Sequence, residues 1–136
     1  MQSVPAENGQ KNEQKRILVV DEEVNSREGL RRWLVGDGHI VETAADGWQA
    51  IRKVKESRFD IAIIDLDLPA VRGVTVNGWD LARIARAYNP QICLIMIGSE
   101  SRARVNAQLV ALRVSEFIEK PISLSHLKML VRRLDP

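Results

Sequence analysis

The sequence lacks several features that would point to particular classes of protein. One cysteine among 136 residues excludes an internal disulfide and a zinc site built from several cysteines. The 20 basic side chains barely outnumber the 18 acidic ones, which argues against a protein built mainly to hold nucleic acid or an anionic membrane surface. No apolar run approaches the roughly 20 residues of a membrane span. The N-terminus is polar rather than signal-like. We therefore expect a soluble, cytoplasmic protein with no direct nucleic acid or membrane contacts.

The length and the N-terminal composition indicate one domain behind a polar leader. A chain of 136 residues can bury the core of one domain. Residues 1–15 are rich in Gln, Asn, Glu and Lys and contain almost nothing to bury, which predicts a disordered leader. The domain itself is expected to span residues 16–136.

Strand and helix patterns alternate five times along this domain. Short apolar runs predict strands at residues 17–20, 39–44, 59–65, 92–97 and 116–119. Apolar residues at helical spacing follow each run. The first, third and fourth strands are apolar on both faces, as in a parallel sheet with helices on each side. The sequence therefore predicts an α/β fold, a doubly wound (βα)5 three-layer sandwich.

Acidic side chains follow two of these strands, and a lysine follows the last. Asp21 and Glu22 come directly after the first strand, Asp65 ends the third with Asp67 two residues later, and Lys120 follows the fifth. Ligands of such sheets bind at the carboxyl ends of the strands, so these side chains are expected to converge. Crowded carboxylates repel each other unless a cation lies between them, and oxygen ligands suit Mg²⁺. An aspartate beside Mg²⁺ and a lysine can accept a phosphoryl group.

These motifs resemble the receiver domain of two-component response regulators over about residues 16–134. "ILVVDEE" is similar to the first strand and acidic pair of that family, "IIDLDLP" to its phosphoacceptor strand, and "EFIEKP" to its last strand with a lysine and a proline. Three motifs in this order, each at a predicted strand end, are a specific signal. The resemblance implies a flavodoxin-like five-stranded parallel sheet with strand order 2-1-3-4-5.

Carried over position by position, the resemblance implies a role for each of these residues. Asp65 is the implied phosphoacceptor. The implied Mg²⁺ ligands are Asp21, Glu22 and Asp65, with Asp67 adding its backbone carbonyl. Lys120 is expected to contact the phosphoryl oxygens. The peptide bond after Lys120 is expected to be cis, as is common in the family.

The switch positions depart from the family pattern. The family's Thr or Ser that contacts the phosphoryl group aligns with Gly98, which has no hydroxyl. Ser99, one residue later, could replace it only if the backbone shifts. Phe117 falls at the aromatic switch position, although a strand aromatic is as often plain core. We therefore expect a protein that is phosphorylated but switches weakly or by a different route.

The loop at residues 70–77, "AVRGVTVN", is a second departure. Roughly five residues look inserted between the proline of "DLDLP" and the next helix. The loop holds three valines and follows the predicted acceptor. It could screen the phosphoryl group or meet a partner.

Several other residues are expected to have structural roles only. Cys93 lies in an apolar strand and should be buried. The tryptophans of three helices should pack against the core, and the two histidines should lie at the surface or cap helices. The residues concerned are Trp33, Trp48 and Trp79, and His39 and His126.

The resemblance implies a receiver domain of a two-component phosphorelay, and no enzyme. It would take its phosphoryl group from a sensor histidine kinase or a phosphotransfer protein and signal through a conformational or partner-binding change. A homodimer or a partner could use the face formed by the fourth helix, fifth strand and fifth helix, although solvated charges explain its basic residues more simply.

Two alternative functions stay open at this point. Gly98 fits a pseudo-receiver, which has the same fold but docks partners independently of phosphorylation. "DLDLP" also resembles the nucleophile motif of haloacid-dehalogenase-type phosphatases, although those place the motif near the N-terminus and need further acids downstream. The sequence names neither the kinase nor the output, and it leaves open whether the chain is the front piece of a longer protein.

Overall fold

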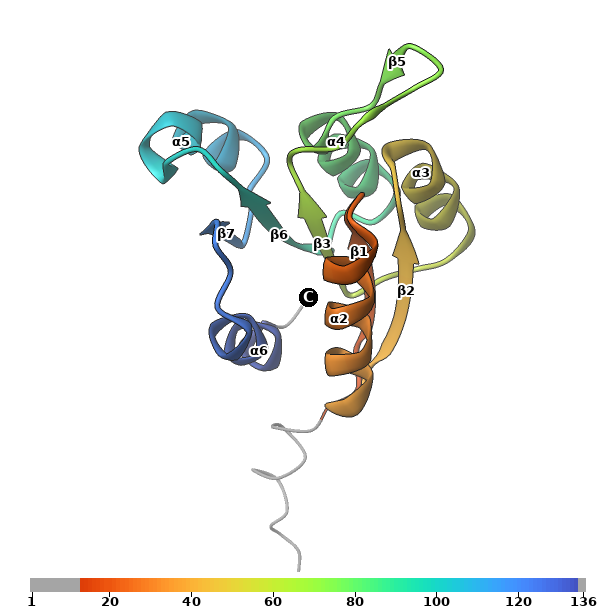
Figure 1. Ribbon diagram of the computed structural model, residues 1–136, viewed down its shortest axis with the longest axis vertical. Helices are drawn as coiled ribbons and strands as arrows, with labels where there is room; N and C mark the ends of the chain where they lie inside the picture. Colours follow the sequence, from red (N-terminus) through yellow and green to blue (C-terminus); the bar gives the residue numbers. More distant parts are fainter. Residues whose placement is uncertain (1–12, 135–136) are drawn as a thin grey trace, which may run out of the picture.

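The computed structural model describes residues 13–134. Its centre is a parallel sheet of five strands in the order β2-β1-β3-β6-β7 (Figure 1). Counted along the chain as five strands, this is the predicted order 2-1-3-4-5, so the predicted fold class is confirmed. The strands are β1 (Arg16–Val20), β2 (Ile40–Ala44), β3 (Ile61–Asp65), β6 (Cys93–Gly98) and β7 (Glu116–Glu119). Most of the predicted leader, residues 1–12, lies outside the described residues.

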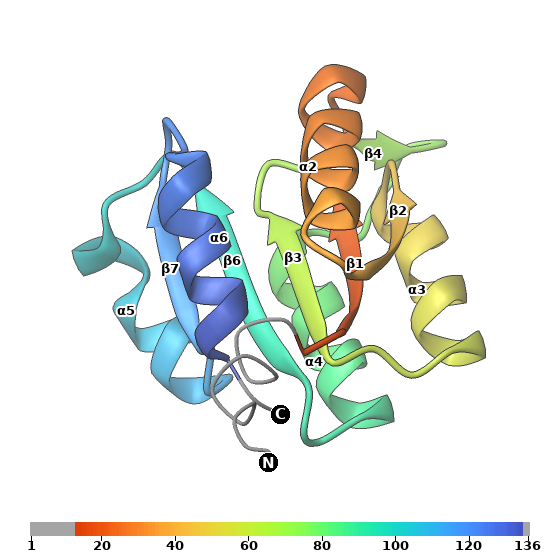
Figure 2. The same ribbon diagram turned by 90° about the horizontal axis from the view of Figure 1, so that it is seen from below.

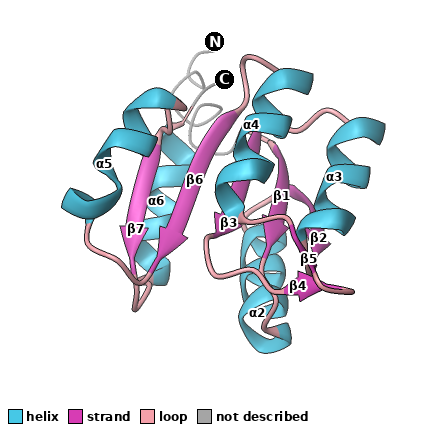
Figure 3. Cartoon of the chain, turned by 90° about the horizontal axis from the view of Figure 1, so that it is seen from above, coloured by secondary structure: helices cyan, strands magenta, loops and turns pink. Residues whose placement is uncertain are grey.

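In the part of the chain that the structure describes, five helices cover the two faces of the sheet (Figures 2 and 3). One face carries α2 (Val24–Gly36) and α6 (Leu124–Arg133), and the other carries α3 (Gly47–Glu56), α4 (Gly78–Tyr88) and α5 (Arg102–Ala111). Each helix follows a polar residue whose side chain accepts a backbone N–H of the first turn, a cap worth about 1 kcal/mol. These caps are Glu23, Asp46, Asn77, Ser101 and Ser123. Within residues 13–134, no helix is long and apolar enough to cross a membrane.

The third strand is buried on both sides and fixes the acid at its end. Ile61 and Ile63 pack into the core under α2 and α6, whereas Ala62 and Ile64 pack into the core under α3, α4 and α5. None of the four is more than 1% exposed. Because the strand is apolar up to Ile64, Asp65 is its first polar side chain, held at the sheet edge by pairing with β6. Cys93 is buried, as predicted.

The loop at residues 70–77 folds into a small hairpin. Its antiparallel strands are β4 (Ala70–Val71) and β5 (Val74–Thr75). Arg72 and Gly73 join them with φ angles of 54° and 76°, as a two-residue turn of type I′ requires. The hairpin projects from the molecule next to α3 and α4 (Figure 1). The sequence did not predict these two strands.

Two side chains differ from the sequence predictions. Trp48 was expected to pack, but it is 45% exposed at the start of α3, whereas Trp33 and Trp79 do pack against the cores. His39 was expected at the surface or as a cap, but it is buried, and its Nδ1 accepts the backbone N–H of Lys15 at 3.1 Å. Lys15 itself is buried, although the sequence places it at the end of the leader. His39 and Lys15 are both buried by segments that are distant in the sequence. A local sequence pattern does not show such contacts.

Asp37, just after α2, connects this helix to α6. Its carboxylate accepts hydrogen bonds from Arg132 at 2.8 and 3.1 Å and lies 3.4 Å from the Lys128 ammonium. The Arg132 hydrogen bond holds the pKa of Asp37 below its ordinary value of 3.8, against the opposing effect of burial. A carboxyl whose pKa is lower in the folded state stabilises the fold above its unfolded pKa, and this stabilisation is lost as the pH falls through the folded pKa.

Asp37→Asn is therefore expected to lower the free energy of unfolding by about 1 kcal/mol at neutral pH, a modest value because Arg132 is partly exposed. The difference from the parent protein should shrink as the pH falls, because the parent aspartate then becomes neutral as well. Urea unfolding at several pH values measures this. Asp80→Asn, which loses an exposed pair with Arg83, should show a smaller difference. If the loss of unfolding free energy in Asp37→Asn stays constant with pH, the stabilisation cannot be assigned to the negative charge of Asp37.

Candidate functional site

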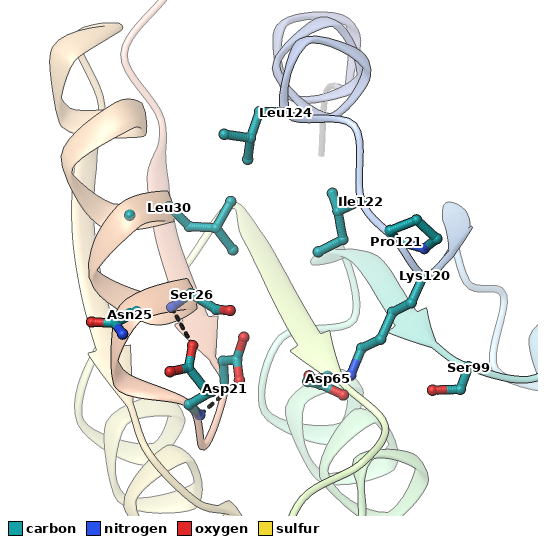
Figure 4. A pocket seen from close by; sticks show the side chains of 12 residues that line it. Asp21, Asn25, Ser26, Leu30, Asp65, Ser99, Lys120, Pro121, Ile122 and Leu124 are labelled. Carbon is teal, nitrogen blue, oxygen red and sulfur yellow. Dashed lines mark hydrogen bonds and ion pairs between the residues drawn. The ribbon is translucent and has the colours of Figure 1, made fainter.

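Two buried carboxylates lie side by side at the carboxyl edge of the sheet. Asp21 directly follows β1 and is 8% exposed, and Asp65 ends β3 and is 6% exposed. The parallel register pairs Val20 with Ile64, so the next residue of each strand reaches the same edge. Both carboxylates line a pocket between α2 and the β7–α6 loop (Figure 4). The structure thus brings these two predicted site residues together.

Lys120 points from the end of β7 into the same pocket (Figure 4). Its Nζ lies 2.9 Å from Oδ2 of Asp65 and 3.1 Å from Oδ2 of Asp67. Burial lowers the pKa of Lys120, but the hydrogen bonds to the two carboxylates outweigh burial and leave the pKa above its ordinary value of 10.5. Lys120 is therefore a cation at neutral pH, placed against the acid that ends β3. The peptide bond between Lys120 and Pro121 is cis, as expected.

The side chain of Asp67 also takes part in this arrangement. Besides Lys120, its Oδ2 accepts a hydrogen bond from Ser99 Oγ at 3.2 Å, and its backbone N–H donates to Asp65 Oδ1 at 2.8 Å. The family resemblance drew attention only to the backbone carbonyl of Asp67. The Asp67 carboxylate connects Lys120 with Ser99, next to Asp65.

The electrostatics of Asp21 favour a cation in the pocket. Burial raises the pKa of Asp21, and the negative charge of Asp65 adds to this, while the N–H of Glu23, 2.9 Å from Oδ1, acts in the opposite direction. A carboxylate that is desolvated and faces another negative charge is stabilised by a bound cation. Mg²⁺ commonly takes one or two carboxylates together with waters, so this donor set fits it. Among the described residues, no three acidic, histidine or cysteine side chains form a metal-binding cluster.

The second residue of the acidic pair lies differently from the first. Glu22 is exposed and is not among the residues that line the pocket, whereas its neighbour Glu23 is. The Glu23 carboxylate accepts the N–H of Ser26 at 2.7 Å and caps α2, which accounts for its lowered pKa. From the sequence, only Asp21 and Glu22 after the first strand were predicted to be site residues, and the place of Glu23 in the pocket was missed.

The switch positions are occupied by a glycine and a buried ring. A Cβ atom on Gly98 would lie 3.0 Å from Leu66 Cδ1 and 3.5 Å from the Phe117 ring. Phe117 is 7% exposed and belongs to the core under α3, α4 and α5. Ser99 is exposed and turned toward Asp67. Of the described residues that line the pocket around Asp65, none comes from residues 70–77.

Comparison with known proteins identifies the family. The family model of the response regulator receiver domain matches residues 17–132. The chain belongs to this family. The transcriptional regulatory protein CusR of Escherichia coli (strain K12) is 25% identical over 119 residues, which are 88% of this chain and 50% of CusR. The response regulator MprA of Mycobacterium sp. (strain KMS) is 28% identical over 125 residues, which are 89% of this chain and 52% of MprA. The chain spans about half the length of these relatives.

Solved structures of receiver proteins have the same fold. The response regulator TrrA of Thermotoga maritima, in complex with Mg(2+)-BeF, is 30% identical with a TM-score of 0.73, covering 88% of this chain and 97% of TrrA. The chemotaxis protein CheY4 of Vibrio cholerae is 27% identical with a TM-score of 0.76, covering 88% and 98%. The chain is thus a response regulator receiver domain, as the sequence predicted, and the comparisons do not favour the phosphatase or pseudo-receiver alternatives.

Proposed function

We propose that this receiver domain accepts a phosphoryl group on Asp65, with Mg²⁺, from a sensor histidine kinase or a phosphotransfer protein. The observation that carries the proposal is the ion pair of 2.9 Å between Lys120 and Asp65, beside Asp21 in one open pocket. An ionised carboxylate costs free energy to bury unless a cation or a hydrogen-bond donor pairs with it, so burial of Asp65 at a strand end calls for a functional reason. Phosphoryl transfer supplies that reason, since it requires a nucleophile, a cation and room for a donor.

The chemistry assigns a task to each of these side chains. An oxygen of the Asp65 carboxylate attacks the phosphorus, forms the P–O bond of an acyl phosphate and breaks the bond between phosphorus and the donor. Lys120 neutralises charge on the phosphoryl oxygens. Mg²⁺, when bound, supplies further positive charge to the same oxygens. Asp21 and Asp65 would hold it, with Glu22 and the backbone carbonyl of Asp67 as further proposed ligands.

Intact mass spectrometry tests this function. The domain is incubated with acetyl phosphate and Mg²⁺, which avoids the need to know the kinase. It should gain the mass of one phosphoryl group, and neither Asp65→Asn nor a sample treated with EDTA should gain it. Asp67→Asn, which removes the neighbouring carboxylate, should still be phosphorylated and serves as the matched control. Equal phosphorylation of Asp65→Asn would refute the assignment, and no phosphorylation of any form would favour the docking module.

The missing hydroxyl at position 98 is proposed to weaken the response to phosphorylation. A hydroxyl there would couple the phosphoryl group to the loop after β6, and Gly98 has none. Ser99 Oγ is instead bound to Asp67. This same glycine is the observation that favours the second candidate function, a phosphorylation-independent docking module.

Gly98→Thr is expected to enlarge the conformational response. A Cβ atom at this buried position would lie 3.0 Å from Leu66 Cδ1, the far end of a flexible side chain, so the variant should fold with a loss of about 1–3 kcal/mol in the free energy of unfolding. Amide chemical shifts are compared with and without beryllofluoride, which mimics a phosphoryl group. Shift changes after β6 should be larger in Gly98→Thr than in the parent, and Ser99→Thr should behave like the parent. A parent protein that already responds as strongly as Gly98→Thr would contradict the proposal.

The downstream partner is proposed to bind the face formed by α5, β7 and α6, as a second copy or another protein. Only some of the basic side chains on this face are available to pair with a partner. Lys128 and Arg132 contact Asp37, and Arg104 lies 3.7 Å from Glu100. This leaves Arg102, Arg113 and Arg133 as the charges with which a partner could pair.

A further inference from the structure

A second groove lies away from Asp65, lined by the β4–β5 hairpin and the first turns of α3. Trp48 and Arg52 line it from the helix, and Val71, Arg72 and Val74 line it from the hairpin. It shares no lining residue with the pocket around Asp65. The phosphorylation proposed at Asp65 therefore does not involve this groove.

The position of the hairpin over α3 is built into the fold. A Cβ atom on Gly47 would lie 2.6 Å from both Cβ and the backbone oxygen of Val76, so only glycine permits this approach. Val76 is buried, and Asn77 directly after it caps α4. The chain directly after the hairpin is therefore packed tightly against the first residue of α3, next to the groove.

The walls of the groove are apolar and exposed. Trp48 is 45% exposed on α3, and Val74 is 53% exposed on β5. Both side chains line the same groove, so water is in contact with apolar surface from two elements. Tryptophan is one of the side chains that are enriched among the residues dominating the binding energy of protein–protein contacts. These walls fit a bulky apolar side chain.

The rim of the groove is positively charged. The guanidinium groups of Arg52 and Arg72 make no hydrogen bond or ion pair within residues 13–134. Asp46 is the acid at the groove, and its carboxylate already accepts the N–H of Gln49 at 2.9 Å as the cap of α3. Arg72 has a φ of 54°, a conformation that costs about 1 kcal/mol for a residue other than glycine. An arginine at this strained position is placed at the very tip of the hairpin.

We propose that this groove binds a short segment of a partner protein in which acidic side chains flank a bulky apolar one. The apolar side chain enters between Trp48 and Val74, and the acids pair with Arg52 and Arg72. Nucleic acid fits less well, because two arginines and a chain net charge of +2 do not form a basic face. A symmetric contact with a second copy would bring the same arginines together and is disfavoured by repulsion.

Selection from a phage-displayed library of short random peptides tests the proposal. The parent domain is the target, and Trp48→Ala is used to remove peptides that bind elsewhere. The enriched peptides should combine Asp or Glu with Leu, Phe or Trp. One enriched peptide is then synthesised, and its dissociation constant is measured by isothermal titration calorimetry. Binding should weaken by about tenfold or more in Trp48→Ala and in the double variant Arg52→Glu, Arg72→Glu.

Two further variants distinguish binding in the groove from general effects of folding or surface charge. Gly47→Ala should weaken binding because it displaces the hairpin from α3 without removing a contacting side chain. Arg32→Glu reverses an exposed charge on α2 and should bind like the parent. Circular dichroism of each variant confirms that it is folded. Because none of these residues lies in the Asp65 pocket, Asp65→Asn should also bind like the parent, so this result does not depend on phosphorylation.

Several outcomes would overturn the proposal. One is a selection that enriches no peptide above the Trp48→Ala background, and another is enrichment of basic peptides. Binding that survives the arginine reversals would remove the charge argument. A dimer in sedimentation that Trp48→Ala dissociates would make a second copy the occupant. Binding of a labelled single-stranded oligonucleotide that depends on Trp48, without any selected peptide, would make nucleic acid the occupant.

Discussion

Lys120→Ala is expected to slow phosphorylation of Asp65 by acetyl phosphate by about 100-fold or more. Lys120 is the cation closest to the proposed nucleophile, with its Nζ 2.9 Å from Oδ2 of Asp65. Its removal leaves the developing charge on the phosphoryl oxygens without that partner. The initial rate of mass gain, measured at saturating Mg²⁺, reports the loss.

Two variants control for charge and for general surface effects. Lys120→Arg keeps the positive charge but changes its geometry, since a planar guanidinium cannot occupy the position of an ammonium, so its rate should fall between those of the parent and Lys120→Ala. Lys55→Ala removes an exposed lysine of α3 and should react like the parent. A Lys120→Ala rate within a few-fold of the parent, in a folded protein, would show that Lys120 does not assist the transfer.

Ile63→Ala is expected to lower the free energy of unfolding by about 3 kcal/mol. Ile63 lies in the middle of β3, is 1% exposed, and pairs with Val19 of β1 and Ile95 of β6. Truncation leaves a cavity between the sheet and the helices α2 and α6, where neither neighbouring strand can move in to fill it. Urea unfolding followed by circular dichroism gives the value.

Val110→Ala is the matched control for this loss. Val110 is 67% exposed on α5, so its truncation should change the free energy of unfolding by no more than about 0.5 kcal/mol. Similar losses for Ile63→Ala and Val110→Ala would contradict the assignment of β3 to the centre of the core. The comparison bears on function as well, because β3 carries Asp65 to the site.

The fold and the main site residues could be predicted because their signals are local. Apolar runs such as residues 61–64 identify strands by composition alone, and their alternation with helical periodicity implies a parallel sheet. The carboxyl ends of parallel strands meet at one edge, so placing Asp21, Asp65 and Lys120 after strands was enough to predict their convergence.

Other features depend on contacts between distant segments and could not be predicted. His39 accepts a hydrogen bond from the backbone of Lys15, 24 residues away, and the groove beside Trp48 is completed by the hairpin residues Val71, Arg72 and Val74. Glu22 does not line the pocket, whereas Glu23, one residue later, lines it and caps α2, and no local pattern in the sequence distinguishes the two. The hairpin carried a usable signal, since Arg72-Gly73 between valines is a possible turn, but an arginine there is unfavourable on local grounds.

The most direct test of the central claim is to identify the phosphorylated residue chemically. The domain is phosphorylated with acetyl phosphate and Mg²⁺ and then treated with sodium borohydride, which reduces an acyl phosphate to an alcohol and so converts the aspartate to homoserine. Peptide mass spectrometry locates the homoserine. We predict that it stands at position 65 and that it is absent without Mg²⁺. Homoserine at Asp21 or Asp67 in place of Asp65, or at no position in a protein that has gained phosphoryl mass, would contradict this account of the site.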